Sequence, residues 1–172
     1  MISVATSTFS GRCFCQFGSA LAAWEKLTQS LDSMAVVFDI GGSAKDDEHV
    51  HSTVRRKIQA RLGYCETSAA VADYELRLES DGRWMTFKET VQSALHRPWE
   101  KVVKERLVED SFSVVMHKMF PELYAVATDW LDLKGGGSTS KGASVEETVA
   151  DIQKMLQHRA PGKTVFLVVD EV

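Results

Sequence analysis

The most constraining feature of this sequence is an apolar run that ends in two adjacent acids. Residues Val165 to Val169 are all apolar, and Asp170 and Glu171 follow directly. Most of the run is β-branched or aromatic, which is typical of a strand buried on both faces. A buried parallel strand delivers its C-terminal residues to the crevice in which α/β proteins bind ligands. We therefore expect Asp170 and Glu171 to lie at such an edge.

An Asp-Glu pair at this position has a defined role in P-loop ATPases. The Asp holds the Mg²⁺ that bridges the nucleotide phosphates, and the Glu orients or activates the attacking water. The run through Asp170 and Glu171 fits this pattern, which is called Walker B. Any buried strand that emerges into a loop can also end in acids, so a purely structural interpretation of the pair stays open.

A second buried strand is predicted from Ala35 to Ile40, ended by Gly41-Gly42-Ser43. Asp46-Asp47-Glu48 is expected to open a helix, because acids are favourable near a helix N-terminus, and Gly63 is expected to end it. The strand, turn and helix together form a βα unit. The turn lacks the G-x-x-x-x-G-K-[ST] order of a phosphate loop, so we do not interpret it as a nucleotide cradle.

The helix that follows this turn is predicted to be amphipathic. Its apolar residues recur every four positions and form one stripe, whereas its cations fill the other faces. We favour a solvated face over a nucleic-acid surface for these cations. The stripe consists of Val50, Val54, Ile58 and Leu62, and the cations are Arg55, Arg56, Lys57 and Arg61.

Residues 68–132 are predicted to be almost wholly helical. The first helix carries Glu75 on the same stripe as Val71, Tyr74 and Leu78. The predicted helices are Ala69–Leu78, Trp84–Leu95, one opened by Pro98 with Trp99, Val102, Val103 and Leu107 inward, Phe112–Met119 and Leu123–Leu131. We expect the four tryptophans, Trp24, Trp84, Trp99 and Trp130, to pack in the core rather than to stack on a ligand.

Residues 134–143 have the composition of a flexible linker. Ser144 and Glu147 then form the S-x-x-E signature of a capping box. The helix that this signature starts has Val145, Val149, Ile152, Met155 and Leu156 on one face. Gly162-Lys163-Thr164 matches the end of a Walker A, but residue 157 is Gln and a strand follows, so we interpret it as a turn.

Composition excludes several classes of protein. The net charge of −4 gives no global basic field for nucleic acid or an anionic membrane, and no apolar run reaches the length of a membrane span. The odd set Cys13, Cys15 and Cys65 fits a reducing compartment, and residues 1–20 lack the features of a secretory signal. We therefore expect a cytoplasmic protein. The Cys13-Phe14-Cys15 pattern is only a weak indication of a metal site. No two histidines are spaced four residues apart, so we do not expect a helical metal site.

The order of these segments resembles part of the large P-loop ATPases of bacterial phage-defence systems, of the BREX and phage-growth-limitation type. The matching residues are Val36-Val37-Phe38-Asp39-Ile40, the stretch from Trp84-Met85-Thr86-Phe87-Lys88 to Pro98-Trp99-Glu100, and Phe166 to Val172. The resemblance covers roughly residues 34–172 and rests on the order and spacing of these three motifs. It implies that Asp170 coordinates Mg²⁺ of Mg-ATP and that Glu171 polarises the hydrolytic water.

The resemblance implies an α/β fold, namely a fragment of a P-loop parallel sheet (two strands) with a large helical insertion. The expected parts are an irregular lead-in and helix (1–33), a βα unit (34–67), the helical insertion (68–133), the linker (134–143), and a helix with the Walker B strand (144–172). No Walker A precedes the first strand, so we expect an internal fragment that does not hydrolyse ATP alone. Its expected partners are the rest of the parent protein or other phage-defence subunits.

Two other functions stay open. One is a small helical interaction module without catalytic activity, in which the Asp-Glu end is structural. The other is a metal-dependent hydrolase that uses Asp39 together with Asp170 and Glu171, since adjacent parallel strands could bring these carboxylates together. A Walker A motif upstream would favour the ATPase over both.

Overall fold

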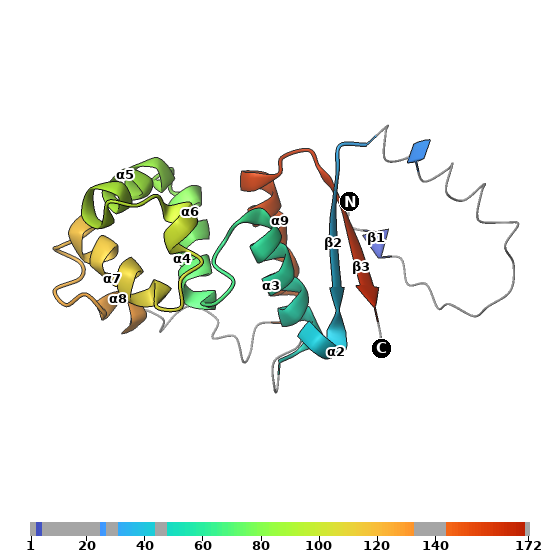
Figure 1. The fold of residues 1–172 in the computed structure, drawn as a ribbon, viewed down its shortest axis with the longest axis horizontal. Helices are drawn as coiled ribbons and strands as arrows, with labels where there is room; N and C mark the ends of the chain where they lie inside the picture. Colours follow the sequence, from blue (N-terminus) through green and yellow to red (C-terminus); the bar gives the residue numbers. More distant parts are fainter. Residues whose placement is uncertain (1–2, 5–24, 27–30, 44–47, 133–143, 171–172) are drawn as a thin grey trace, which may run out of the picture.

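The computed structural model describes residues 3–4, 25–26, 31–43, 48–132 and 144–170. Over this part the protein is mixed α/β and mostly helical. The strands lie at one end, α3 and α9 lie beside them, and helices α4 to α8 form the opposite end (Figure 1). The elements in chain order are β1 (Ser3–Val4), β2 (Ser33–Asp39), α2 (Ile40–Ser43), α3 (Val50–Leu62), α4 (Ala69–Ser80), α5 (Trp84–Leu95), α6 (Trp99–Val102), α7 (Val108–Met119), α8 (Asp129–Asp132), α9 (Val145–Arg159) and β3 (Thr164–Asp170).

The described strands form a parallel sheet in the order β1-β3-β2. β2 and β3 pair along their whole length, from Ser33 opposite Thr164 to Asp39 opposite Asp170. This confirms the prediction of two parallel strands, separated in the sequence by a long helical region. The two-residue strand β1 pairs with the other edge of β3, with Val4 opposite Leu167. β1 was not predicted, because two residues are too few to show a strand period.

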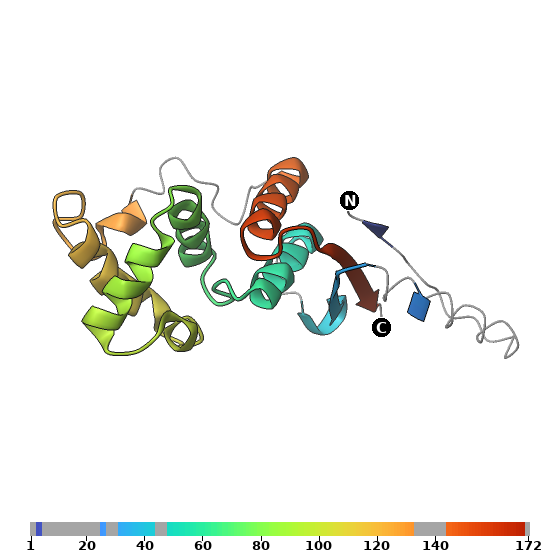
Figure 2. The ribbon, with the colours of Figure 1, turned by 90° about the horizontal axis from the view of Figure 1, so that it is seen from above.

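One face of this sheet is covered by α3 and α9 (Figure 2). Residues paired in register point to the same face, so the side chains of Met34 and Val165 lie together, and both are buried. Ile58 of α3 and Ile152 of α9 pack on the same side and complete a small core with Val36 and Phe38. Part of each predicted apolar stripe therefore contacts the sheet, namely Val54 and Ile58 of α3 and Ile152 and Leu156 of α9.

A second and larger core lies among α4 to α8 and is dominated by aromatic rings. Phe87 meets Trp99 edge-on at 5.0 Å between ring centroids, and Phe112 meets Trp130 at 4.8 Å. Trp99 and Trp130 are fully buried, and Trp84 packs against the same cluster. The prediction that these tryptophans belong to the core is confirmed, whereas Trp24 lies outside the described residues.

Four predicted helix boundaries are wrong, one of them the start of α7, which is Val108 rather than Phe112. The helix expected from Leu123 to Leu131 is reduced to the single turn of α8, because the Asp129 carboxylate accepts the Val126 N–H and closes a turn instead. The helix opened by Pro98 ends at Val102, so Leu107 is exposed rather than inward.

The fourth error concerns the start of α3, which begins at Val50. Glu48 lies before the helix and accepts hydrogen bonds from Thr53 and Arg56. Asp46 and Asp47 are outside the described residues, as is the linker of residues 134–143. Of the helix expected within residues 1–33, Glu25 and Lys26 are described as helical, whereas Leu31 is described as a bend. Within the described ranges, no helix combines the length and apolar character needed to cross a membrane.

Candidate functional site

The carboxyl edge of the sheet brings two acids together. β2 ends at Asp39 and β3 at Asp170, and these residues are register partners on adjacent strands. The backbone of Asp170 thus occupies the predicted position at the carboxyl end of a parallel strand. The prediction that this strand is buried on both faces is wrong, because Val168 is exposed. The side chain of Asp170 and the whole of Glu171 lie outside the described residues.

The carboxylate of Asp39 is engaged by the turn that follows it. Its Oδ1 accepts the Gly41 N–H at 2.8 Å, and its Oδ2 accepts the Gly42 N–H at 2.9 Å. A Cβ atom at Gly42 would lie 2.8 Å from Oδ2, so a larger residue there would require the Asp39 carboxylate to shift. Asp39 therefore anchors α2, which explains its presence without a metal ion.

The described residues test the hydrolase hypothesis only at Asp39, because the side chain of Asp170 and the whole of Glu171 lie outside them. No group of three or more His, Cys, Asp or Glu side chains among them is arranged to hold a metal ion. Asp39 is close to Asp170 along the sheet edge, as that hypothesis requires, but both oxygens of Asp39 already accept backbone N–H groups. A structural role accounts for Asp39 more simply.

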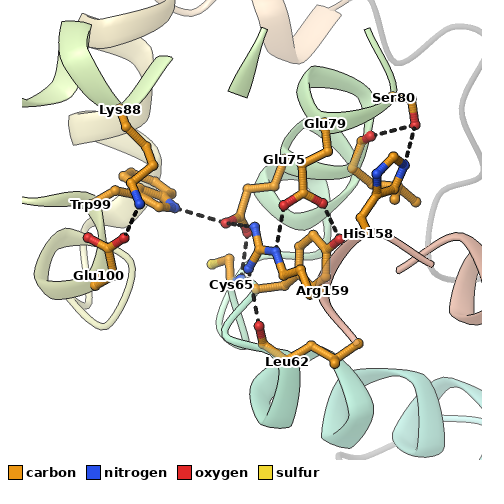
Figure 3. Close-up of polar contacts among 12 residues, drawn as sticks. Leu62, Cys65, Glu75, Glu79, Ser80, Lys88, Trp99, Glu100, His158 and Arg159 are labelled. Carbon is orange, nitrogen blue, oxygen red and sulfur yellow. Dashed lines mark hydrogen bonds and ion pairs between the residues drawn. The ribbon is translucent and has the colours of Figure 1, made fainter. Parts of the chain in front are cut away.

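A second cluster of polar side chains is buried between α4, α6 and α9, centred on Glu75 (Figure 3). Glu75 has no exposed surface. Its Oε1 accepts the indole N–H of Trp99 at 2.8 Å and an N–H of Arg159 at 3.3 Å. Its Oε2 accepts the backbone N–H of Cys65 at 2.7 Å. Both carboxylate oxygens are thus satisfied within the protein.

Arg159, in the last turn of α9, connects this cluster to its surroundings (Figure 3). Its Nε donates to Glu79 at 2.6 Å, and its Nη1 donates to the carbonyl of Leu62 at 3.4 Å. Its guanidinium carbon lies 3.4 Å from the ring centroid of Tyr64 and 4.8 Å from that of Trp84. One side chain therefore joins α9 to two carboxylates of α4, to the Tyr64 ring between α3 and α4, and to the Trp84 ring of α5.

Burial controls the electrostatics of the cluster. Desolvation raises the pKa of Glu75 to about 7, although the Arg159 charge and the N–H donors of Trp99 and Cys65 lower it. Desolvation also raises the pKa of Tyr64, and the hydrogen bond from its hydroxyl to Glu79 acts in the same direction. Because no solvent reaches Glu75, a substrate cannot reach it either. The cluster is structural rather than catalytic.

Sequence reasoning placed Glu75 on an apolar stripe but gave it no role, and it did not single out Arg159. An acid within an otherwise apolar helix face was the available signal, since buried charges are normally paired. The partner could not be identified in the same way, because Arg159 follows Glu75 at a large sequence separation and sits in a different helix.

The cations of α3 are largely paired with acids, so the prediction of a solvated face is wrong in part. Arg55 forms ion pairs with Asp73 of α4 and Asp151 of α9. Arg56 pairs with Glu48 at 2.9 Å, and Lys57 lies 3.6 Å from Glu66. These contacts connect α3 to its neighbours and neutralise much of the charge that a nucleic acid would bind.

An apolar groove of about 430 Å³ runs between α3, α9 and β3. Val145 and Val149 of α9 line it and are exposed there, although the apolar pattern put them on the same face as the buried Ile152. Val50 of α3 is exposed in the same groove. The lining contains few polar groups that could orient a ligand, so the groove is suited to apolar side chains.

The comparisons with known proteins identify no similar protein. No protein-family model matches the chain, and neither a curated protein nor a solved structure gives a match.

Proposed function

We propose that this chain supplies the Walker B strand of a P-loop ATPase of the BREX and phage-growth-limitation type. The observation that carries the proposal is the place of β3. It lies between two parallel strands, and its last described residue, Asp170, stands at the carboxyl edge of the sheet. This is the edge at which open α/β sheets bind ligands.

In this proposal the acids have separate roles. Asp170 would hold the Mg²⁺ that accompanies ATP, and Glu171 would orient the attacking water and accept its proton. The Mg²⁺ ion, when bound, would neutralise charge on the nucleotide phosphates. Asp39 would keep its structural role and hold the turn beside this edge, through the N–H groups of Gly41 and Gly42.

The phosphate cradle is the part that these 172 residues do not contain. No G-x-x-x-x-G-K-[ST] motif occurs in the sequence, so the backbone N–H groups and lysine that hold the phosphates would come from elsewhere in the parent protein or from a partner subunit. We therefore expect no ATP hydrolysis by the chain alone. A cytoplasmic location among other phage-defence subunits is part of the same proposal.

The test begins with the DNA on both sides of the reading frame. The proposal expects an encoded Walker A motif there, following a predicted strand. The protein that unites both parts should hydrolyse Mg-ATP, and Glu171→Gln should lower kcat by about 100-fold or more while nucleotide binding persists. Glu146→Gln, which changes an exposed acid of α9, is the matched control and should leave kcat unchanged. No Walker A in any frame, or equal activity of the two variants, would overturn the proposal.

A second candidate is a helical interaction module without catalytic activity. It is favoured by the aromatic core of α4 to α8, which these helices form largely among themselves. Under this candidate Asp170→Asn leaves function unchanged, because the acidic end is structural. Under the ATPase proposal the same variant loses Mg²⁺-dependent turnover, so one substitution separates the two.

A further inference from the structure

The buried cluster between α4, α6 and α9 contains two carboxylates that share one guanidinium (Figure 3). The side chain of Glu75 is 0% exposed and that of Glu79 is 6% exposed. Both accept hydrogen bonds from Arg159, whose side chain is 15% exposed. If both acids are ionised, this group carries one more negative than positive charge in a place that solvent hardly reaches. A proton on one of the two acids therefore stabilises the closed arrangement, because an uncompensated buried charge is costly.

The hydrogen bonds indicate which of the two acids takes this proton. The Nε atom of Arg159 lies 2.6 Å from Glu79, whereas its Nη2 atom lies 3.3 Å from Glu75. The Tyr64 hydroxyl also donates to Glu79. Glu79 thus has the closer share of the positive charge, and the other two donors to Glu75 are uncharged N–H groups. The proton accordingly belongs on Glu75, in agreement with the burial that raises the pKa of this residue.

The described residues supply no second cation to Glu75, since Arg159 is the one with which it forms an ion pair. Two other cationic or basic side chains nearby are engaged elsewhere. Lys88 lies 2.6 Å from Glu100, and His158 lies 3.3 Å from the Ser80 hydroxyl. The titratable and charged groups that the surrounding elements contribute are Glu79 of α4, Tyr64 and Cys65 before α4, Lys88 of α5, Glu100 of α6, Glu109 of α7, and His158 and Arg159 of α9.

We propose that Glu75 makes the contact between α4 and α9 proton-dependent, so that the contact closes with a proton on the Glu75 carboxyl and releases this proton to water when it opens. With the proton in place, Arg159 and Glu79 balance each other. Above neutral pH the closed contact has to hold two carboxylates against one guanidinium, so it opens more readily. Because α9 contributes to both hydrophobic cores, such conditions loosen the attachment of α4 and its neighbouring helices to the part of the protein that covers the sheet.

The indole N–H of Trp99 reports the protonation state of Glu75, because it donates to a carboxylate oxygen of that residue. The indole of Trp130 is a matched control, since it is also buried but donates to the Ser113 hydroxyl. In NMR spectra of the full chain recorded from about pH 5 to about pH 9, the Trp99 indole signal should shift in one step and the Trp130 signal should stay in place. In Glu75→Gln the step should be absent. A Trp99 signal that does not move in the parent chain, or a step that persists in Glu75→Gln, would overturn the proposal.

Hydrogen exchange of the Cys65 amide tests the consequence for the contact, because this N–H donates to Glu75 and loses its acceptor when the contact opens. After correction for the intrinsic pH dependence of exchange, the opening equilibrium in the parent chain should rise by up to about tenfold per pH unit and level off above neutral pH, since one proton is released. Glu79→Gln leaves Arg159 to Glu75 alone and should largely remove this rise. Glu100→Gln, which changes an exposed acid, should leave it unchanged. An opening equilibrium that does not vary with pH in the parent chain, or an equal rise in Glu79→Gln, would contradict the proposal.

Discussion

The carboxylate of Glu75 is held by three N–H donors in a place that no solvent reaches, beside the partly buried charge of Arg159. Removing one partner of such a pair leaves the other charge and its donors unsatisfied. We expect Glu75→Ala to lower the free energy of unfolding by about 3–5 kcal/mol. Urea denaturation followed by tryptophan fluorescence measures this. Glu100→Gln breaks the exposed pair with Lys88 and should cost less than about 1 kcal/mol. Equal costs for the two variants would mean that burial does not determine the effect.

The raised pKa of Glu75 also predicts how stability changes with pH. Its pKa is about 7 in the folded protein, against an ordinary value of 4.5, because burial disfavours the charged form. Between these two values the folded state binds more protons than the unfolded state, so the contribution of Glu75 to stability falls as pH rises. In urea titrations at several pH values from 5 to 8, Glu75→Gln should remove this part of the decline. If the parent chain and Glu75→Gln vary with pH in parallel, the pKa of Glu75 is not raised.

At the scale of single elements, α9 shows what a local signal can predict. The Ser144 hydroxyl accepts the Glu147 N–H at 3.2 Å, and the Glu147 carboxylate accepts the Ser144 N–H at 2.9 Å, so the predicted capping box is present. Ser144→Ala should therefore lower the free energy of unfolding by about 1 kcal/mol, seen as a lower Tm by circular dichroism. Lys154→Ala, in the exposed middle of the same helix, should change it by less than about 0.5 kcal/mol. An equal Tm for both variants would show that the box adds no stability.

Two wrong helix predictions show where local sequence signals fail. The capping box involves residues three positions apart, so the sequence contains all the information needed. Residues 123–131 have the apolar spacing of a helix but do not form one over that length. The Asp129 carboxylate accepts the Val126 N–H and closes a turn instead. Leu107 was misplaced for a related reason, since α6 is a single turn and the helical phase is lost before α7 begins at Val108.

At the scale of the whole molecule, the sequence predicted that two strands pair in parallel. It did not predict which remote segments contact one another. The apolar runs at residues 35–40 and 165–169 were sufficient to predict two parallel strands. The pairing of β1 with β3, and the ion pairs of Arg55 and Arg159 with distant helices, depend on three-dimensional contacts between remote segments. No period in the sequence encodes such contacts. The place of Asp170 at the sheet edge was predictable because it follows from strand direction alone.

The described part of the chain has two hydrophobic cores, and Arg159 lies where they meet. One core covers the sheet and the other lies among the helices from α4 onward, while α9 contributes Ile152 to the first and Met155 to the second. The bonds of Arg159 to Glu75 and Glu79 hold α9 against α4. We therefore expect Arg159→Ala to reduce the coupling between the two cores as well as total stability.

Hydrogen exchange in low urea can measure this coupling. In the parent chain the slowest amides of β2 and β3 should open together with those of α5 and α7, as one cooperative unit. In Arg159→Ala the opening free energies of the two groups should differ by about 1–2 kcal/mol, because contacts between neighbouring parts typically carry coupling of that size. Lys163→Ala removes an exposed ion pair with Asp32 and should leave the two groups together. The sheet amides and the helix amides could also open together in Arg159→Ala. That result would contradict the prediction and would mean that the apolar contacts of α9, such as those of Met155, are sufficient to couple the two cores.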